Sequence, residues 1–141
     1  MINFTVGPVQ SGPEVLEIGA QQVPYFRTPE FSKIMLENEA LMLKFSKAPE
    51  NARVVFLTGS GTAAMEAAIM NVFTAEDKVL LVNGGGFGQR FHELCQIHQV
   101  SFEEILLETG KALTASDLLP YENRGFTAFL VNIHETSTGV H

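Results

Sequence analysis

The sequence has a single cysteine, no tryptophan and fewer basic residues than acidic ones. Cys95 cannot form an internal disulfide, which favours a reducing, cytoplasmic setting. The net charge of −7 argues against nucleic acid as the main partner, because phosphate backbones select basic surfaces. No apolar run approaches the roughly 20 residues that span a bilayer, and the first residues have no secretion-signal pattern. We therefore expect a cytoplasmic protein without a nucleic-acid or membrane partner.

The residues that are present suffice for a folded domain. Of the 141 residues, 45% are apolar and 18% are charged, a composition that builds a core rather than a disordered chain. Strand patterns alternate with helix patterns along most of the sequence, which predicts an α/β fold with a mostly parallel sheet. In such a sheet, the loops at the carboxyl ends of the strands form the site.

The first part of the chain is predicted to be mainly helical. Residues 2–6 read as a short strand or extended arm, and a short helix is expected to begin at Pro13. A longer helix over 29–46 begins at a good cap, because Thr28 offers a hydroxyl and Pro29 fits the first helical position. Apolar residues recur along this helix at helical spacing and predict a buried stripe: Phe31, Ile34, Met35, Leu41, Met42 and Phe45.

The second part alternates strands and helices. Strands are predicted over 53–57, 78–82, within 101–108 and over 126–131, with helices to about 73, over 89–99 and over 115–119. Cys95 is expected in the core of the second of these helices. His92 and His98 are expected at its surface or at an interface, Glu103, Glu104 and Glu108 are expected at a solvated surface, and no metal spacing surrounds His134.

A glycine turn joins the strand at 53–57 to the helix that follows it. Gly59 and Gly61 let the backbone approach an anion, and the first helical N–H groups point at it unpaired. The helix dipole adds positive charge, and Ser60 and Thr62 can donate hydroxyl groups. The turn therefore predicts a site for a phosphate-bearing ligand. The spacing also fits a dinucleotide fingerprint, although Asn83 stands where that fingerprint requires an acid.

Three loops in register resemble the N-terminal half of the class V (fold-type I) pyridoxal-phosphate aminotransferases. The loops are residues 59–68, 83–90 and 134–139, and the likeness extends from Gly7 and Pro8 to the last residue. It is greatest to the alanine–glyoxylate, serine–pyruvate and 2-aminoethylphosphonate–pyruvate transaminases. The resemblance implies a three-layer αβα fold, with an N-terminal arm and helices over 1–50 and part of the cofactor-binding large domain over 51–141. The rest of the large domain and the small domain would be absent.

The resemblance also implies the cofactor, pyridoxal 5′-phosphate, and its contacts. The cofactor phosphate would lie at the start of the helix after the first glycine turn, and an aromatic ring would stack on the pyridine face. Glu135 matches a glutamate of the family. The assigned residues are Ser60, Gly61 and Thr62 for the phosphate, Phe87 for the ring face, Thr136 and Ser137 for the ring substituents, and Gly7 and Pro8 for the substrate side.

The covalent half of such a site is missing. In this family the lysine that forms a Schiff base with the cofactor and the carboxylate that pairs with the pyridinium nitrogen follow the 134–139 motif, beyond His141. None of the five lysines has the family context, so no residue of this chain is assigned as catalytic: Lys33, Lys44, Lys47, Lys78 and Lys111. We expect an inactive portion of a homodimeric enzyme that transfers an amino group between a small amino acid (alanine, serine or 2-aminoethylphosphonate type) and pyruvate or glyoxylate.

Three alternatives remain open at the level of the sequence. The chain could be a short protein that uses the same turn only to bind a phosphate ligand or a partner. It could be a dinucleotide binder of the Rossmann type. Within the same family, it could derive from a sulfur-transferring lyase, which needs a reactive cysteine in the missing half.

Overall fold

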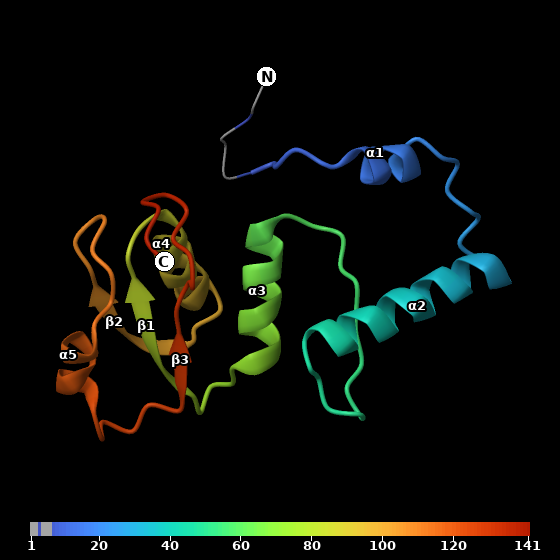
Figure 1. Ribbon diagram of the computed structural model, residues 1–141. Helices are drawn as coiled ribbons and strands as arrows, with labels where there is room; N and C mark the ends of the chain where they lie inside the picture. The colour runs from blue at the N-terminus through green and yellow to red at the C-terminus, as the bar shows by residue number, and fades with distance from the viewer. Residues whose placement is uncertain (1–2, 4–6) are drawn as a thin grey trace. The chain divides into compact units, whose positions relative to one another are not determined.

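The computed structural model describes Asn3 and residues 7–141 and divides into two compact units, residues 1–57 and 58–141 (Figure 1). Apart from Asn3, the strand or arm expected over residues 2–6 lies outside the described residues. The domain boundary expected at residue 50 stays a prediction. In the described part of the chain, no helix is long and apolar enough to cross a membrane.

The first unit contains two helices, α1 (Pro13–Gly19) and α2 (Pro29–Phe45). Pro13 occupies the first position of α1, and the Thr28 hydroxyl accepts a hydrogen bond from the N–H of Phe31 at 3.3 Å. Both helices begin where the sequence predicts, because proline and the cap act within a single turn.

The buried stripe expected on α2 is wrong. No residue of α2 is buried, and Phe45, at its last position, is 84% exposed. Helical spacing determines which side chains share a face, but not whether another element covers that face. Among the described residues, every buried one belongs to the second unit.

The strand predicted over 53–57 is also wrong. These residues form no ladder with any described strand, and Val55 and Leu57 are more than two-thirds exposed. Their anchor is Glu39 on α2, whose Oε1 accepts from the N–H of Val54 at 3.3 Å and lies 3.2 Å from Nε of Arg53. A strand requires a neighbouring strand for its backbone groups, and the described residues of this unit supply none.

The second unit is an α/β structure with a parallel sheet, as predicted. The strands lie in the order β2–β1–β3, and both outer strands pair with the central one in parallel. Leu81 in the central strand lies opposite Glu104 and Leu130. The elements in chain order are α3 (Gly61–Val72), β1 (Lys78–Asn83), α4 (Gly86–Ile97), β2 (Ser101–Leu106), α5 (Ala115–Leu118), the 3-10 turn η1 (Leu119–Tyr121) and β3 (Ala128–Leu130).

Two elements of the second unit differ in extent from the prediction. Helix α4 begins at Gly86, three residues before the predicted start, since its first turn is closed by groups from another loop. Strand β3 covers three of the six predicted residues, because only these three pair with β1.

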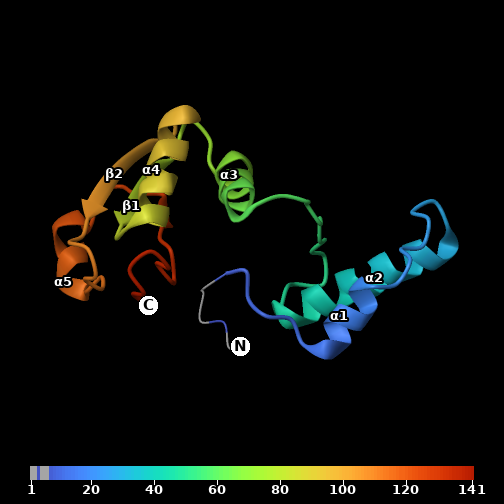
Figure 2. The ribbon, with the colours of Figure 1, turned by 90° about the horizontal axis from the view of Figure 1, so that it is seen from above.

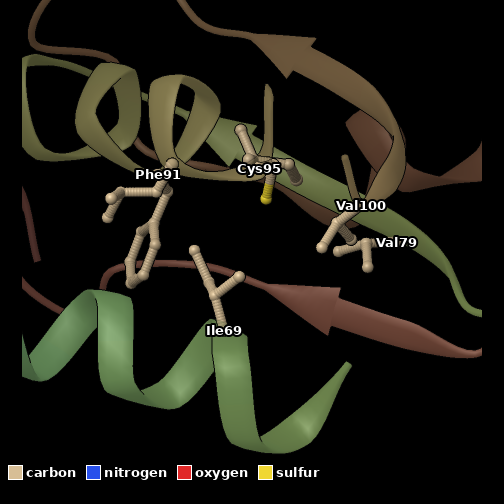
Figure 3. Close-up of a cluster of buried hydrophobic side chains, with 7 residues drawn as sticks. Ile69, Val79, Phe91, Cys95 and Val100 are labelled. Carbon is tan, nitrogen blue, oxygen red and sulfur yellow. The ribbon is translucent and has the colours of Figure 1, made fainter. Parts of the chain in front are cut away.

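The second unit has three layers: the sheet in the middle and helices on each of its two faces, held there by apolar side chains. On one face Val79 and Leu81 pack against α3 and α4, and Figure 3 shows Ile69 meeting Phe91 and Cys95 there. On the other face Leu80 and its neighbours Val82 and Ile105 pack against the α5 and η1 region, and Figure 2 shows α5 on the side away from α3. Cys95 is fully buried, as predicted, and burial raises the pKa of its thiol.

Candidate functional site

Two loops of the second unit meet at the carboxyl-terminal end of its parallel strands, and the start of α3 lies on the same side of the unit. Strands β1 and β3 point the same way because they are parallel, and the start of α3 lies toward that end (Figure 1). This end of the strands therefore brings together residues 83–88 and 132–140, and residues 59–62 lie on the same side; all three segments were singled out in the sequence.

The N-terminus of α3 offers open backbone donors. The Ser60 hydroxyl caps the helix by accepting from the N–H of Ala63 at 3.2 Å, and the carbonyl of Ser60 accepts from Ala64 at 3.1 Å. Among the described residues, no partner is recorded for the N–H groups of Gly61 and Thr62. A Cβ on Gly61 would meet nothing within 4 Å. This helix start can therefore receive an anion.

The N-terminus of α4 is closed by side chains of the 132–140 loop. The Ser137 hydroxyl accepts from the N–H of Gly86 at 2.8 Å. The carboxylate of Glu135 accepts from the next two N–H groups, with Oε1 at 3.2 Å from the nitrogen of Phe87 and Oε2 at 2.9 Å from that of Gly88. An internal carboxylate thus occupies the position at which an external anion would bind.

Glu135 is 5% exposed and is held by several hydrogen bonds besides those to α4. Its Oε1 also accepts from the Ser137 hydroxyl at 2.6 Å, and its own N–H donates to the carbonyl of Val140 at 2.9 Å. Burial alone would raise the pKa of Glu135, but the hydrogen bonds from Ser137, Gly88 and Phe87 together hold that pKa below its ordinary value. Glu135 is therefore the charged centre that joins two of the three loops.

Two glycines permit this close approach. A Cβ on Gly85 would lie 2.5 Å from Oγ of Ser137 and 2.8 Å from Cγ of Glu135. A Cβ on Gly88 would lie 2.7 Å from Cα of Asn83. All three distances are far shorter than van der Waals contact, so the local packing requires glycine at both positions.

Phe87 stands on the first turn of α4 between two glycines, Gly86 and Gly88. Its side chain is 40% exposed, unlike Phe91 one turn further along, which is buried in the core. A flat ligand could cover the exposed ring. The assignment of Phe87 to the cofactor ring stays a prediction with a suitable geometry.

The remaining residues predicted to contact the cofactor or substrate differ in their environments. The hydroxyl of Ser137 is engaged by Glu135 and Gly86, and Thr136 beside it is half-buried. Gly7 and Pro8 are exposed and belong to the first unit. The roles assigned to these residues stay predictions.

A polar cluster at the end of β1 was not anticipated from the sequence. Asn83 is 4% exposed, and its Nδ2 donates to Oε1 of Gln89 at 3.0 Å and to Oε1 of Glu104 at 2.9 Å. The same Glu104 oxygen lies 2.9 Å from Nδ1 of His92. The expectation of a solvated surface is wrong for Glu104, which is half-buried together with His92. The sequence signal that could have predicted this cluster is Asn83, a polar residue at the end of an otherwise apolar strand.

No family model matches the chain. The chain is 30% identical over 142 residues to an uncharacterized aminotransferase of Helicobacter pylori, covering 99% of this chain and 37% of that protein. It is 33% identical over 102 residues to the 2-aminoethylphosphonate–pyruvate transaminase of Pseudomonas aeruginosa, covering 70% and 27%. A protein named as the small subunit of the soluble hydrogenase of Synechococcus is 35% identical over 130 residues, covering 89% and 33%.

Solved structures give the same result. The aspartate aminotransferase of Thermus thermophilus superposes with a TM-score of 0.72 at 31% identity, covering 81% of this chain and 32% of that one. The alanine–glyoxylate aminotransferase of Nostoc superposes with a TM-score of 0.69 at 28% identity, covering 79% and 29%. The chain thus spans about a third of the length of these proteins. Over that third the chain is similar to proteins named as aminotransferases, in agreement with the resemblance of its three loops to the class V aminotransferases.

Proposed function

We propose that the chain carries the phosphate-binding and ring-binding half of a pyridoxal 5′-phosphate site. The observation that supports this most is the contrast between two helix N-termini on the same side of the second unit. The N–H groups of Gly61 and Thr62 on α3 have no recorded partner among the described residues, whereas those of α4 are satisfied by Glu135 and Ser137. A ligand phosphate therefore has one helix start to bind, and the ring of Phe87 is exposed for an aromatic ligand.

The residues present suit both parts of this cofactor. Two backbone donors, the positive end of a dipole and the hydroxyls of Ser60 and Thr62 suit a phosphate dianion. An aromatic side chain flanked by glycines suits a pyridine ring. Within the proposal we assign Thr136 and Ser137 to the ring substituents and, on the family resemblance alone, Gly7 and Pro8 of the first unit to the substrate side.

When bound, this cofactor supplies an electron sink that allows an amino group to pass between an amino acid and a 2-oxo acid. The residues of this chain bind and orient it. We assign the covalent role to no lysine of the chain. Of the two lysines in the second unit, Lys78 has its Nζ 2.9 Å from Glu103, and Lys111 has its Nζ 3.6 Å from Asp117. The reactive lysine would belong to the remainder of a longer protein.

For that longer protein we propose transamination between a small amino acid and a 2-oxo acid, as a cytoplasmic homodimer. The amino acid would be of the alanine, serine or 2-aminoethylphosphonate type, and the oxo acid pyruvate or glyoxylate. The names of the relatives support the reaction class.

Calorimetric titration of the chain with pyridoxamine 5′-phosphate tests the proposal. This form has no aldehyde, so it cannot condense with surface lysines, and any binding is non-covalent. We expect binding that is lost with pyridoxamine lacking the phosphate and weakened about 10- to 150-fold in Thr62→Val, which removes one donor to a charged group. If the wild-type chain binds neither this compound nor inorganic phosphate, the proposal is wrong.

One observation favours a second function, a non-catalytic module that binds a phosphate ligand. The α3 start offers all its donors to a phosphate whether or not a cofactor ring is bound elsewhere. That module would bind inorganic phosphate and pyridoxamine 5′-phosphate with equal affinity. A dinucleotide binder is disfavoured, because the Asn83 amide at the end of β1 already donates to Gln89 and Glu104 instead of facing a ribose.

A further inference from the structure

We propose that Glu135 is a positioning residue, which sets the direction in which Phe87 presents its ring to the cofactor. The inference rests on the proposed function, because a fixed ring direction matters only if an aromatic ligand stacks on it. No contact between Glu135 and the ligand is required. Glu135 acts on the backbone that carries Phe87.

The two oxygens of one carboxylate hold the two peptide groups that flank the Phe87 Cα. The N–H of Phe87 belongs to the peptide before this carbon and donates to Oε1. The N–H of Gly88 belongs to the peptide after it and donates to Oε2. Holding both planes fixes φ and ψ of Phe87, and with them the direction of its Cα–Cβ bond.

The carboxylate is itself held rigidly by its own loop. Oε1 accepts from the Ser137 hydroxyl, Oε2 lies 3.4 Å from Nδ2 of Asn132, and the loop is closed by the hydrogen bond from Glu135 to Val140. The Ser137 hydroxyl continues the same array to Gly86. Three successive N–H groups of α4 are thereby fixed by one loop, although Glu135 lies 48 positions from Phe87 in the sequence.

The charge of Glu135 also separates the two halves of the ligand. A second anion at the α4 start would meet a buried carboxylate instead of open donors, so the ligand phosphate is directed to α3. The ring then meets Phe87, whose neighbours Gly86 and Gly88 have no side chains that could block it. Glu135 thus keeps phosphate away from α4 but makes no contact at the α3 start, so its removal should weaken ring binding and leave phosphate binding at α3 unchanged.

The test compares Glu135→Gln with Glu108→Gln, which removes the same charge from an exposed side chain. The amide that Glu135→Gln introduces has one oxygen and one NH₂, so it presents a donor to an N–H group on one side. In this variant we expect pyridoxamine 5′-phosphate to bind about 3- to 10-fold more weakly, the value of one aromatic stack. Binding of inorganic phosphate should change less than about 2-fold, and Glu108→Gln should match the wild type for both ligands.

A double-mutant cycle with Phe87→Leu provides the readout that a merely structural role would not move. If Glu135 acts through Phe87, adding Glu135→Gln to Phe87→Leu produces little further loss. Additive losses, equal losses for both ligands, or no loss would each overturn the proposal. Glu135→Asp, which keeps the charge on a shorter side chain, replaces Glu135→Gln in the same cycle if the latter does not fold.

Failure of the proposed function can be recognised separately. If the wild type binds neither ligand, amide hydrogen exchange at Phe87 and Gly88 decides whether Glu135 fixes the backbone. Faster exchange at these two amides in Glu135→Gln than in Glu108→Gln supports the positioning. Equal exchange overturns it.

Discussion

The hydroxyl of Ser60 caps α3 and therefore stabilises this helix whether or not a ligand is bound. It is the only side-chain acceptor recorded at that helix start among the described residues, and it holds the N–H of Ala63. We predict that Ser60→Ala lowers the free energy of unfolding by about 1 kcal/mol, the usual value of such a cap. Urea denaturation measures this. Ser101→Ala, at an exposed serine, should change stability by less than about 0.5 kcal/mol, and equal losses in the two variants would contradict the role of Ser60 as a cap.

Gly84 and Gly85 are neighbours with opposite tolerance for a side chain. A Cβ on Gly85 would collide with Ser137 and Glu135, whereas one on Gly84 would lie 3.7 Å from Cδ1 of Leu107, an ordinary contact. We predict that Gly85→Ala costs about 1–3 kcal/mol of stability by overpacking, and that Gly84→Ala is nearly neutral. Thermal unfolding of the two variants checks this. A Gly85→Ala protein as stable as Gly84→Ala would mean that the two loops do not pack as closely as described.

At the scale of the element, α4 depends on a charge that acid removes. The pKa of Glu135 is lowered in the folded state, so its stabilising effect is full above the unfolded pKa of about 4.3 and is lost as the pH falls through the lower folded pKa. We predict that the wild type exceeds Glu135→Gln in stability by about 1–3 kcal/mol at pH 7.

Urea denaturation of both proteins from pH 7 to pH 3 measures this difference. It should be constant down to about pH 5 and then shrink, because below the unfolded pKa protons bind the unfolded wild type first. Asp77, Glu103 and Asp117, whose pKa values are also lowered, are common to both proteins and cancel. A difference that grows toward acid would contradict the carboxylate role.

Elements with local causes were predictable from the sequence, and those with distant causes were not. The start of α2 follows from Thr28 and Pro29, which are adjacent in the chain. The failed strand at 53–57 has the right composition, but strands exist only in pairs and composition does not name a partner. In the candidate site, the α3 turn was readable because its donors and cap lie within four residues. The closure of α4 was not, because Glu135 comes from a loop almost 50 residues away.

At the scale of the whole molecule, both edges of the sheet are open in the described chain. Strands β2 and β3 each have one neighbour, and many large apolar side chains are exposed, including Phe129 of β3 at 49%. Unpaired strand edges beside apolar surface promote association with other chains. We therefore predict that the 141-residue chain self-associates with rising concentration, as measured by sedimentation velocity.

A lysine placed on an edge strand opposes such pairing, so Phe129→Lys should shift the association to higher protein concentration. Ile97→Lys provides the matched control, because Ile97 is 67% exposed at the end of α4 and lies on no edge. Equal shifts in the two variants would attribute the association to general apolar exposure instead of the strand edge. A wild-type chain that stays monomeric at every protein concentration measured would show that these strand edges do not cause association. The homodimer proposed for the longer protein would then have to be sought in its remaining two-thirds.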